Sequence, residues 1–467
     1  MDLASRSVPT LASARRTSLA AALAALCTCV PFDAGATTWP VSSCADGGSG
    51  TLRSAVAAAA SGDTVDLSSL ACSRISLTTG AIVIPQNDLT LQGPAAGVEI
   101  TGNSNGTIEA DRVLYHSGTG TLGVRDLAIT YGKLDTGGAE GGCIYSAGSV
   151  FLYRSRVSAC LAQSPAGTPS AVGGGLHVAK NLIAKYSTID DNLVTGGSPL
   201  GGGAFVTGEF IAYYSTVSDN IAVGTGGGVV AYQGAVITNS TISANSAGFD
   251  GGLLVRGNPL TAHVQIVNST ISGNAATGFG AQAGTVGGIE IRSLPTTVQY
   301  STIAFNTAGA GKVPGAFVGY YYRAPGLVLV ALPSDSFTAT LQSVLLSNNT
   351  YGTTEADFST AGTGTITVSS ANNLIRASTG PQKPGTVSVQ CPLLGPLRDN
   401  GGPTKTHALQ SGSPAIDAGG TAATPTTDQR GAPYTRRSGT NADIGAYEVQ
   451  KADRVFSAGF DGCPALL

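Results

Sequence analysis

A pattern of short apolar runs, each preceded by a glycine-rich or polar turn, repeats through the middle of the chain. In each unit a glycine-rich turn leads into one apolar run, as in Gly173-Gly174-Gly175-Leu176. A second run follows as Ser-Thr-Ile-x-x-Asn, as in Ser240-Thr241-Ile242 with Asn245. Runs this short are not stable alone, so the units are expected to stack. By subtraction of sequence numbers, successive asparagines from Asn192 to Asn306 lie 28, 25, 29 and 32 residues apart. The repeated asparagines are Asn192, Asn220, Asn245, Asn274 and Asn306, with Asn348 as a looser copy.

Stacked units of this length predict a parallel β-helix. Equivalent residues of neighbouring coils would lie about 4.8 Å apart, so that the Ile, Val and Leu positions line the interior. An asparagine at the same bend of every coil can hydrogen-bond to the coils above and below, and glycine at the other bend supplies left-handed backbone. We therefore expect an all-β fold, a right-handed single-stranded parallel β-helix with a helical N-terminal cap and a loop-rich C-terminal module.

The β-helix needs a cap because an open end exposes strand edges. The segment Thr51 to Ala60 is the best helix-forming stretch of the chain, and Ser61-Gly62 ends it. We expect this helix to be the N-terminal lid, followed by a first coil that starts with Asp63-Thr64-Val65-Asp66-Leu67.

Composition narrows the possible partners. Of the 467 residues 65 are Gly and only 11% are charged, with a formal net charge of −3. Because no cluster of Lys and Arg appears, a nucleic-acid partner is not expected. No Cys-x-x-Cys spacing occurs, and we expect neither a metal site nor a cofactor.

Residues 1–36 have the pattern of an export signal. Arg15-Arg16 precedes an apolar run over residues 17–30, and Ala34-Gly35-Ala36 offers small residues to a signal peptidase. Cleavage there would make Thr37 the mature N-terminus and leave no transmembrane segment, which predicts a secreted or outer-surface protein. A twin-arginine signal or a lipidated cysteine within the apolar run is the alternative.

Removal of the signal leaves six cysteines, an even number that suggests disulfides in an exported protein. Spacing alone leaves the pairing open, and local pairs are preferred. One of them would replace the repeated asparagine, because its second cysteine follows Val157 at the offset where later units have Asn. The expected pairs are Cys44–Cys72, Cys143–Cys160 and Cys391–Cys463.

Three segments resemble known families. Cys44 with Gly50-Thr51-Leu52-Arg53-Ser54-Ala55-Val56 and Gly62-Asp63-Thr64-Val65 resembles the CSLREA segment of secreted bacterial β-helix proteins. The repeats resemble those of polymorphic outer membrane proteins, which have Phe where this chain has Ile or Val. Residues 391–448 resemble a choice-of-anchor module. Its segments are Asp399-Asn400-Gly401-Gly402-Pro403-Thr404, Gly412-Ser413-Pro414-Ala415-Ile416-Asp417, Asp428-Gln429-Arg430-Gly431 and Asp443-Ile444-Gly445-Ala446. These resemblances imply a pectin-lyase-like fold and secretion or surface display, and they imply no established reaction.

The expected organisation follows from these features. Residues 1–36 form the signal peptide, 37–75 the N-terminal cap and first coil, 76–375 the parallel β-helix, 376–450 the choice-of-anchor-like module and 451–467 a C-terminal tail.

Two acidic groups are candidates for chemistry. Asp190-Asp191 and Asp219 lie one coil apart, where stacked carboxylates could bind calcium or act as an acid–base pair. The β-helix hydrolases with paired aspartates also carry Gly-His-Gly and Arg-x-Lys, which are absent here, so we favour turn residues that face water. Asp250 is expected on a variable loop, where its replacement would cost little stability. The second group contains Asp417, Asp428, Arg430 and Asp443, which we expect to stabilise turns in the C-terminal module.

An outward-facing strip is the candidate binding surface, since alternation along the strands puts polar and aromatic residues outside. Arginines there could neutralise the carboxylates of an acidic glycan while aromatic rings stack on sugars. The alternative is an outer sheet face that long loops cover. The residues of the strip are His177, Tyr232, Arg256, Glu290 and Arg292, and the insertion Tyr320-Tyr321-Tyr322-Arg323 is either a sugar platform or a packed loop.

The function that these features favour is a secreted or surface-displayed, non-catalytic and adhesin-like protein. It would be a monomer that binds a polysaccharide or another cell-surface ligand along the helix face. A polysaccharide lyase or glycoside hydrolase of the pectate-lyase-like fold is the alternative.

Overall fold

A computed structural model describes residues 35–102, 111–278, 286–309, 325–386, 388–421 and 424–450. The chain divides into two units, Met1–Ala36 and Thr37–Leu467, and the second contains every described helix and strand. Residues 1–34 of the expected signal, the Tyr320–Arg323 cluster, Cys463 and the expected tail lie outside the described residues.

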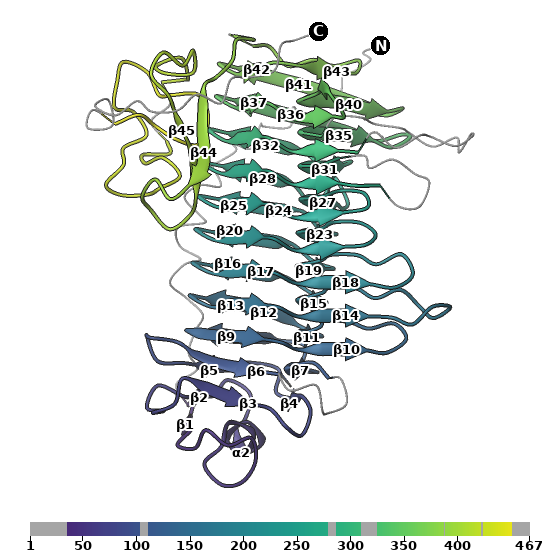
Figure 1. Cartoon of the computed structure of the whole chain (residues 1–467), viewed down its shortest axis with the longest axis vertical. Helices are drawn as coiled ribbons and strands as arrows, with labels where there is room; N and C mark the ends of the chain where they lie inside the picture. The colour runs from purple at the N-terminus through teal and green to yellow at the C-terminus, as the bar shows by residue number, and fades with distance from the viewer. Residues whose placement is uncertain are drawn as a thin grey trace, which may run out of the picture. The chain divides into compact units, whose positions relative to one another are not determined.

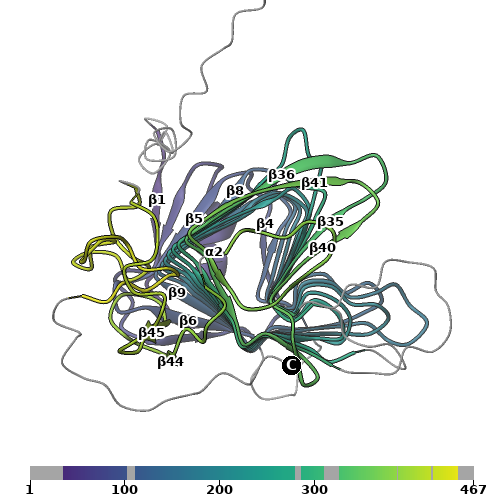
Figure 2. The ribbon, with the colours of Figure 1, turned by 90° about the horizontal axis from the view of Figure 1, so that it is seen from above.

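The second unit is a right-handed parallel β-helix, as the repeats predict (Figure 1). From β7 (Leu114–His116) to β38 (Thr350–Tyr351) each coil passes through four sheets in the order C, A, B and D, and its strands pair in parallel with the equivalent strands of neighbouring coils. The described coils before β7 and after β39 (Thr354–Glu355) have strands in sheets C, A and B. Seen along the axis, the coils superimpose closely (Figure 2). Among the described strands, antiparallel pairing occurs between β38 (Thr350–Tyr351) and β39 (Thr354–Glu355), and between β44 (Leu394–Arg398) and β45 (Thr406–Leu409).

The strands of the four sheets have the following bounds. Sheet C contains β4 (Ile82–Ile84), β7 (Leu114–His116), β11 (Ile144–Ser146), β15 (Leu176–Val178), β19 (Ala204–Val206), β23 (Val229–Ala231), β27 (Leu253–Arg256), β31 (Ile289–Arg292), β35 (Leu327–Ala331), β40 (Phe358–Gly362) and β43 (Ser378–Thr379). Sheet A contains β1 (Thr38–Pro40), β2 (Thr64–Asp66), β5 (Leu89–Gln92), β8 (Thr121–Arg125), β12 (Ser149–Tyr153), β16 (Leu182–Lys185), β20 (Phe210–Tyr213), β24 (Ala235–Thr238), β28 (Val264–Val267), β32 (Thr296–Gln299), β36 (Ser336–Gln342) and β41 (Thr365–Ala371). Sheet B contains β3 (Arg74–Ser76), β6 (Val98–Thr101), β9 (Leu127–Thr130), β13 (Arg156–Ser158), β17 (Thr188–Asp190), β21 (Thr216–Ser218), β25 (Thr241–Ser243), β29 (Thr270–Ser272), β33 (Thr302–Ala304), β37 (Leu345–Ser347) and β42 (Leu374–Ile375). Sheet D contains β10 (Lys133–Asp135), β14 (Leu161–Gln163), β18 (Leu193–Thr195), β22 (Ile221–Ala222), β26 (Ser246–Ala247), β30 (Ala275–Ala276), β34 (Thr307–Ala308), β38 and β39.

The core is a stack of aliphatic side chains, because alternate residues of each strand face the interior. In one coil Leu176 of sheet C, Leu182 of sheet A and Ile189 of sheet B are all fully buried, and the same positions are apolar in the neighbouring coils. The outward positions are therefore where polar chemistry is found.

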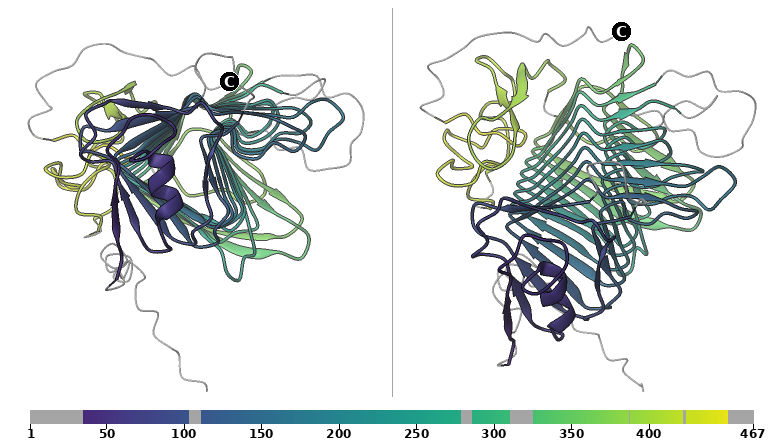
Figure 3. Two further views of the ribbon diagram at one scale, coloured as in Figure 1. Left: turned by 90° about the horizontal axis from the view of Figure 1, so that it is seen from below. Right: turned by 60° about the horizontal axis from the view of Figure 1, so that its bottom comes forward.

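The N-terminal end is closed by helix α2 (Leu52–Ala58), which Figure 3 shows across the first coil. Thr51 caps the helix by accepting a hydrogen bond from the backbone N–H of Ser54, and Leu52 and Val56 are buried. The helix ends sooner than the expected Ala60, because the N–H of Ala60 donates to the carboxylate of Asp63 instead of continuing the helix.

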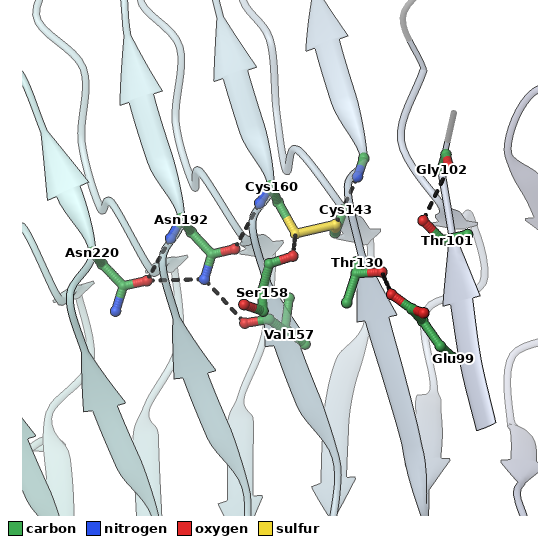
Figure 4. The surroundings of a disulfide bond; sticks show 11 residues. Glu99, Thr101, Gly102, Thr130, Cys143, Val157, Ser158, Cys160, Asn192 and Asn220 are labelled. Carbon is green, nitrogen blue, oxygen red and sulfur yellow. Dashed lines mark hydrogen bonds between the residues drawn. A yellow bond between two sulfur atoms is a disulfide. The ribbon is translucent and has the colours of Figure 1, made fainter. Parts of the chain in front are cut away.

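Buried asparagines form a continuous ladder at the bend between sheets B and D. The Nδ2 of Asn192 donates to Oδ1 of Asn220 at 2.9 Å and to the carbonyl of Val157 at 3.1 Å, and the N–H of Asn192 donates to the same Oδ1 (Figure 4). The same pattern continues through the later coils, so that each side chain satisfies backbone that would otherwise be buried unpaired. The later members are Asn220, Asn245, Asn274, Asn306 and Asn349.

The prediction of Asn348 was wrong by one position. Asn349 is the residue that accepts from Asn306, while Asn348 has φ +60° and lies just before the ladder. An offset counted from Leu345 gives Asn348, but Leu346 is the residue in register with Ile303. Counted from Leu346, the Ile-x-x-Asn spacing is preserved.

Two of the expected disulfides are present, Cys44–Cys72 and Cys143–Cys160. The N–H of Cys160 donates to Oδ1 of Asn192, so this cysteine does occupy the asparagine position of its coil. Cys391 is also disulfide-bonded.

The C-terminal segment, described over residues 391–421 and 424–450, packs against the outer face of sheet B (Figures 1 and 2). His407 Nε2 lies 2.8 Å from the hydroxyl of Ser272, and Gln429 Oε1 accepts from the hydroxyl of Thr270. Apolar contacts accompany these bonds, with Leu409 and Ile444 in one cluster with residues of sheet B. Residues far apart in the sequence therefore hold this segment on the coils.

Candidate functional site

The outer face of sheet C carries a row of aromatic side chains on successive strands. The register places Tyr115, Tyr145, His177 and Phe205 directly above one another on β7, β11, β15 and β19. Neighbouring ring centroids are 5.2, 5.3 and 5.2 Å apart, and Tyr232 continues the row at 5.0 Å from Phe205. We call these five residues the aromatic row.

Each end of the aromatic row carries an arginine. The guanidinium of Arg112 lies 5.0 Å from the ring centre of Tyr115 and 5.4 Å from that of Tyr145. At the other end Arg256 lies over Tyr232 at 3.6 Å. Both contacts are within the range of a cation–π interaction. Burial lowers the pKa of Arg112, and its Nε is buried with no hydrogen-bond partner within the described part of the chain. This nitrogen is therefore a donor that a ligand could use.

A hollow of about 390 Å³ lies beside the first ring of the row. The outward side chain on the preceding strand is Val83, which is in register with Tyr115 and 55% exposed. Apolar, acidic and basic groups thus meet at this end. The lining residues are Thr79, Gly80, Ala81, Val83, Asp111, Arg112 and Tyr115.

The five predicted strip residues lie on this face, but the structure exposes them unequally. His177 and Glu290 occupy the same outward column, and both are buried, at 8% and 2% exposed. Tyr232 and Arg292 are half-buried, and Arg256 is exposed. The middle of the strip is covered, because Phe205, Val230 and Leu254 pack with residues that precede the strands.

Asp250 and Glu290 form a buried acidic pair under this face. Arg292 bonds to Glu290 through its Nε, and one oxygen of Asp250 has no hydrogen-bond partner in the described residues. Burial and the neighbouring Glu290 carboxylate raise the pKa of Asp250 well above its usual range. The expectation that Asp250 lies on a variable loop was wrong, since it is 1% exposed and directly precedes the turn into β27.

A second acidic residue, Glu140, lies beside His177 of the aromatic row. Nδ1 of His177 is 3.5 Å from Glu140, which is too long for a strong hydrogen bond. The interaction with His177 lowers the pKa of Glu140. The imidazole is thus positioned by Tyr145 and Phe205 on either side more than by this acid.

Local contacts and backbone conformation account for the two acidic groups considered from the sequence. Asp190 pairs with Arg156 at 2.5 Å, while Asp191 and Asp219 have φ of 55° and 59° at the bend before the asparagine ladder.

In the C-terminal segment, Asp428 binds Arg430, whose guanidinium lies between the rings of Tyr434 and Tyr447 at 3.8 and 3.9 Å. Asp443 accepts backbone N–H groups of Asp417 and Val449.

Tyr115, Tyr145 and Arg112 were not among the predicted residues. A signal for Tyr145 was present, since Gly141-Gly142-Cys143-Ile144 is one of the repeats and the next residue faces outward like His177. Tyr115 and Arg112 lie in a coil that lacks the glycine turn, so only the strand register identifies them.

Comparison with known proteins adds one likeness of fold. No model of a protein family matches the chain, and no curated protein matches its sequence. The structure is similar to a crystal structure of pectate lyase Pel9A, with 14% identity, a TM-score of 0.40, and coverage of 88% of this chain and 96% of that chain. A likeness of this size says nothing about the site. The chain's own strand pairing defines it as a parallel β-helix protein.

No helix in the described ranges is long and apolar enough to cross a membrane. Among the same residues, no group of three His, Cys, Asp or Glu side chains could hold a metal ion.

Proposed function

We propose that this protein is a secreted or surface-displayed, non-catalytic β-helix protein that binds a glycan on the outer face of sheet C. The observation that carries the proposal is the aromatic row with an arginine at each end and a hollow beside Tyr115. Flat aromatic faces contact the apolar faces of sugars, and arginines bind their carboxylates or hydroxyls.

Extracellular display is supported by the two disulfides, which persist in oxidising compartments. The resemblance of residues 391–448 to a choice-of-anchor module supports attachment to a surface. We propose that the export signal, the CSLREA-like segment and this module together direct the β-helix to the cell exterior.

The test is a glycan-array screen of the purified protein and of a variant with Tyr115→Ala and Tyr145→Ala. We expect the variant to lose at least tenfold in affinity for the glycans that the wild type binds. The control is Tyr131→Ala, because Tyr131 is exposed on another face, in a bend position where other coils have Ala159 and Ala244. Equal binding by all three proteins would contradict the proposal.

A polysaccharide lyase or glycoside hydrolase is the second candidate. The observation in its favour is the acidic pair, since a raised pKa at Asp250 beside Glu290 and Arg292 is a pattern found in acid–base sites. Ultraviolet absorbance of unsaturated products, or release of reducing ends, during incubation with bound glycans tests it. Turnover that disappears in Asp250→Asn would replace the binding proposal with an enzymatic one.

A further inference from the structure

A second aromatic group lies at the bend where sheet A turns into sheet B. Tyr153 ends β12, and Tyr186 and Tyr214 directly follow β16 and β20. The two bend residues have φ of 52° and 48°, a left-handed conformation that recurs at this bend in coil after coil. We call Tyr153, Tyr186 and Tyr214 the corner ladder.

The rings of the corner ladder contact one another along the helix axis. Tyr186 and Tyr214 are stacked with centroids 5.1 Å apart and an interplanar angle of 8°. Tyr153 meets Tyr186 edge to face at 6.2 Å, and Phe151 lies 6.3 Å from Tyr153. Tyr186 is 41% exposed, so that a large ring faces solvent at the centre of the ladder.

Three cationic side chains surround these rings. The guanidinium of Arg125 lies 5.7 Å from the ring centre of Tyr153, that of Arg154 lies 4.7 Å from it, and Nζ of Lys185 lies 5.9 Å from the ring centre of Tyr186.

The carboxylate of Asp126 offsets part of this charge. Arg154 binds the buried carboxylate of Asp126 at 2.7 and 2.8 Å. Three cations and one carboxylate give these four side chains a net charge of +2, on a protein whose formal net charge is −3. The surface therefore favours a negatively charged ligand.

The chain's own C-terminal segment already binds the continuation of this bend. A Cβ on Gly431 would lie 3.1 Å from the ring of Tyr214. In the next coils Asn239 donates to the carbonyls of Asp428 and Gln429, and Asn268 donates to that of Thr427. The asparagines of the column thus bind the C-terminal segment, Tyr214 touches its edge, and Tyr153 and Tyr186 lie in the coils before that contact.

We infer that the corner ladder binds an extended anionic polysaccharide. Its tyrosine rings would pack on sugar faces, and Arg125, Arg154 and Lys185 would bind carboxylate or sulfate groups. Stacking rings with cations also suit a single-stranded polynucleotide. Three cations make a short basic surface, however, which matches a few acidic groups better than a long phosphate backbone. The corner ladder is separate from the outer face of sheet C and shares with the proposed function only the class of ligand.

The test compares binding of a soluble polyuronate with binding of its fully methyl-esterified form, which has the same backbone without the charge. The variant is Tyr186→Asn with Arg125→Gln, because Asn239 shows that asparagine is accepted at this bend. Arg154 is left in place, since its loss would strand the buried Asp126. We expect a loss of at least tenfold in affinity for the polyuronate, weaker binding of the ester, and weaker binding at high salt.

The variant with Tyr115→Ala and Tyr145→Ala is the control that separates the two proposals. If it retains polyuronate binding while the corner variant loses it, the inference stands whatever the array shows for sheet C. Three results would each overturn the inference: no polyuronate binding by the wild type, undiminished binding by the corner variant, or tighter binding of a single-stranded oligonucleotide than of the polyuronate.

Discussion

Single polar side chains, repeated once per coil, satisfy the backbone of this fold. The Ser of the Ser-Thr-Ile-x-x-Asn repeat has such a role, because the N–H of Ser187 donates to the hydroxyl of Ser215, and that of Ser215 to Ser240. Each serine hydroxyl also donates to the carbonyl two residues before it. Serine and asparagine therefore form parallel ladders at the two ends of the sheet B strands.

Replacing Asn245 with Ala tests the asparagine ladder. Its fully buried side chain donates to Val217 and Asn274 and accepts two hydrogen bonds from Asn220. Because several buried groups would lose partners, we expect the free energy of unfolding to fall by about 1–3 kcal/mol. Urea denaturation measures the change. The exposed Asn258, which accepts one bond from Leu260, is the control, and an equal loss in Asn258→Ala would argue against the ladder.

Replacing Asp250 with Asn tests the buried acidic pair. The pKa of Asp250 is higher in the folded chain than in the unfolded one, so the unfolded chain releases its proton first as pH rises. Folding is thus increasingly disfavoured above pH 3.8, the ordinary value. We expect Asp250→Asn to melt at a higher temperature than wild type at pH 7, with the difference shrinking towards pH 4. A variant that is less stable at pH 7 would contradict this assignment.

At the scale of elements, the sequence predicts the period of the coils and the inward positions of the runs after the glycine turn and within Ser-Thr-Ile, because the same side chains recur in each coil. The prediction fails where the repeat loosens. Asn348 fits the pattern only if Leu345 is the inward residue, although Leu346 holds that place. Asp250 resembles a loop residue because no local pattern shows that Glu290, one coil later, faces it.

At the start of the asparagine ladder, the Cys143–Cys160 disulfide can be replaced by an asparagine side chain at position 160. Removing the disulfide, which joins cysteines 17 positions apart, should lower the free energy of unfolding by about 3 kcal/mol. In the double variant Cys143→Ala with Cys160→Asn, the new side-chain amide can donate to Oδ1 of Asn192. Each asparagine of the ladder donates to the next one in the same way.

We therefore expect the variant with Cys160→Asn to be more stable than the one with Cys160→Ala, each combined with Cys143→Ala. Thermal melting of both proteins without reductant measures the difference. If the two variants have the same melting temperature, position 160 does not act as a ladder position.

At the scale of the whole described unit, contacts between distant segments decide which faces are open. The C-terminal segment reaches sheet B across 135 residues from Ser272 to His407, and across 189 from Asn239 to Asp428. No periodicity encodes such contacts. The sequence therefore could not predict that the C-terminal segment covers the outer face of sheet B. The covered middle of the predicted strip corresponds to the alternative that the sequence left open, although residues just before the strands cover it.

His407 makes the attachment of this segment sensitive to acid. Burial lowers the pKa of His407 to about 4, from 6.5 ordinarily. Because the unfolded chain binds the proton first, stability is lost as pH falls from 6.5 towards 4, by about 2 kcal/mol at pH 5. Comparison of denaturant unfolding at pH 7 and 5 for wild type and His407→Gln should show this loss in the wild type only.

The carboxyl of Asp443 works in the opposite direction, since burial raises its pKa to about 7 and folding gains from its protonation. Both proteins retain Asp443, so its contribution cancels in the difference between them. An identical pH response of wild type and His407→Gln would show that His407 does not control the attachment.

The contact of the C-terminal segment with particular coils has a consequence for how this chain can change over evolutionary time. A whole coil can be duplicated or deleted before Tyr214 without disturbing that segment, because it contacts no residue there through a described hydrogen bond. Between Asn239 and Leu345 the same event would shift Asn239, Asn268 and Thr302 relative to their partners by one coil. Relatives of this protein should therefore vary in length mainly in their first coils, and keep a constant number of coils beneath the C-terminal segment.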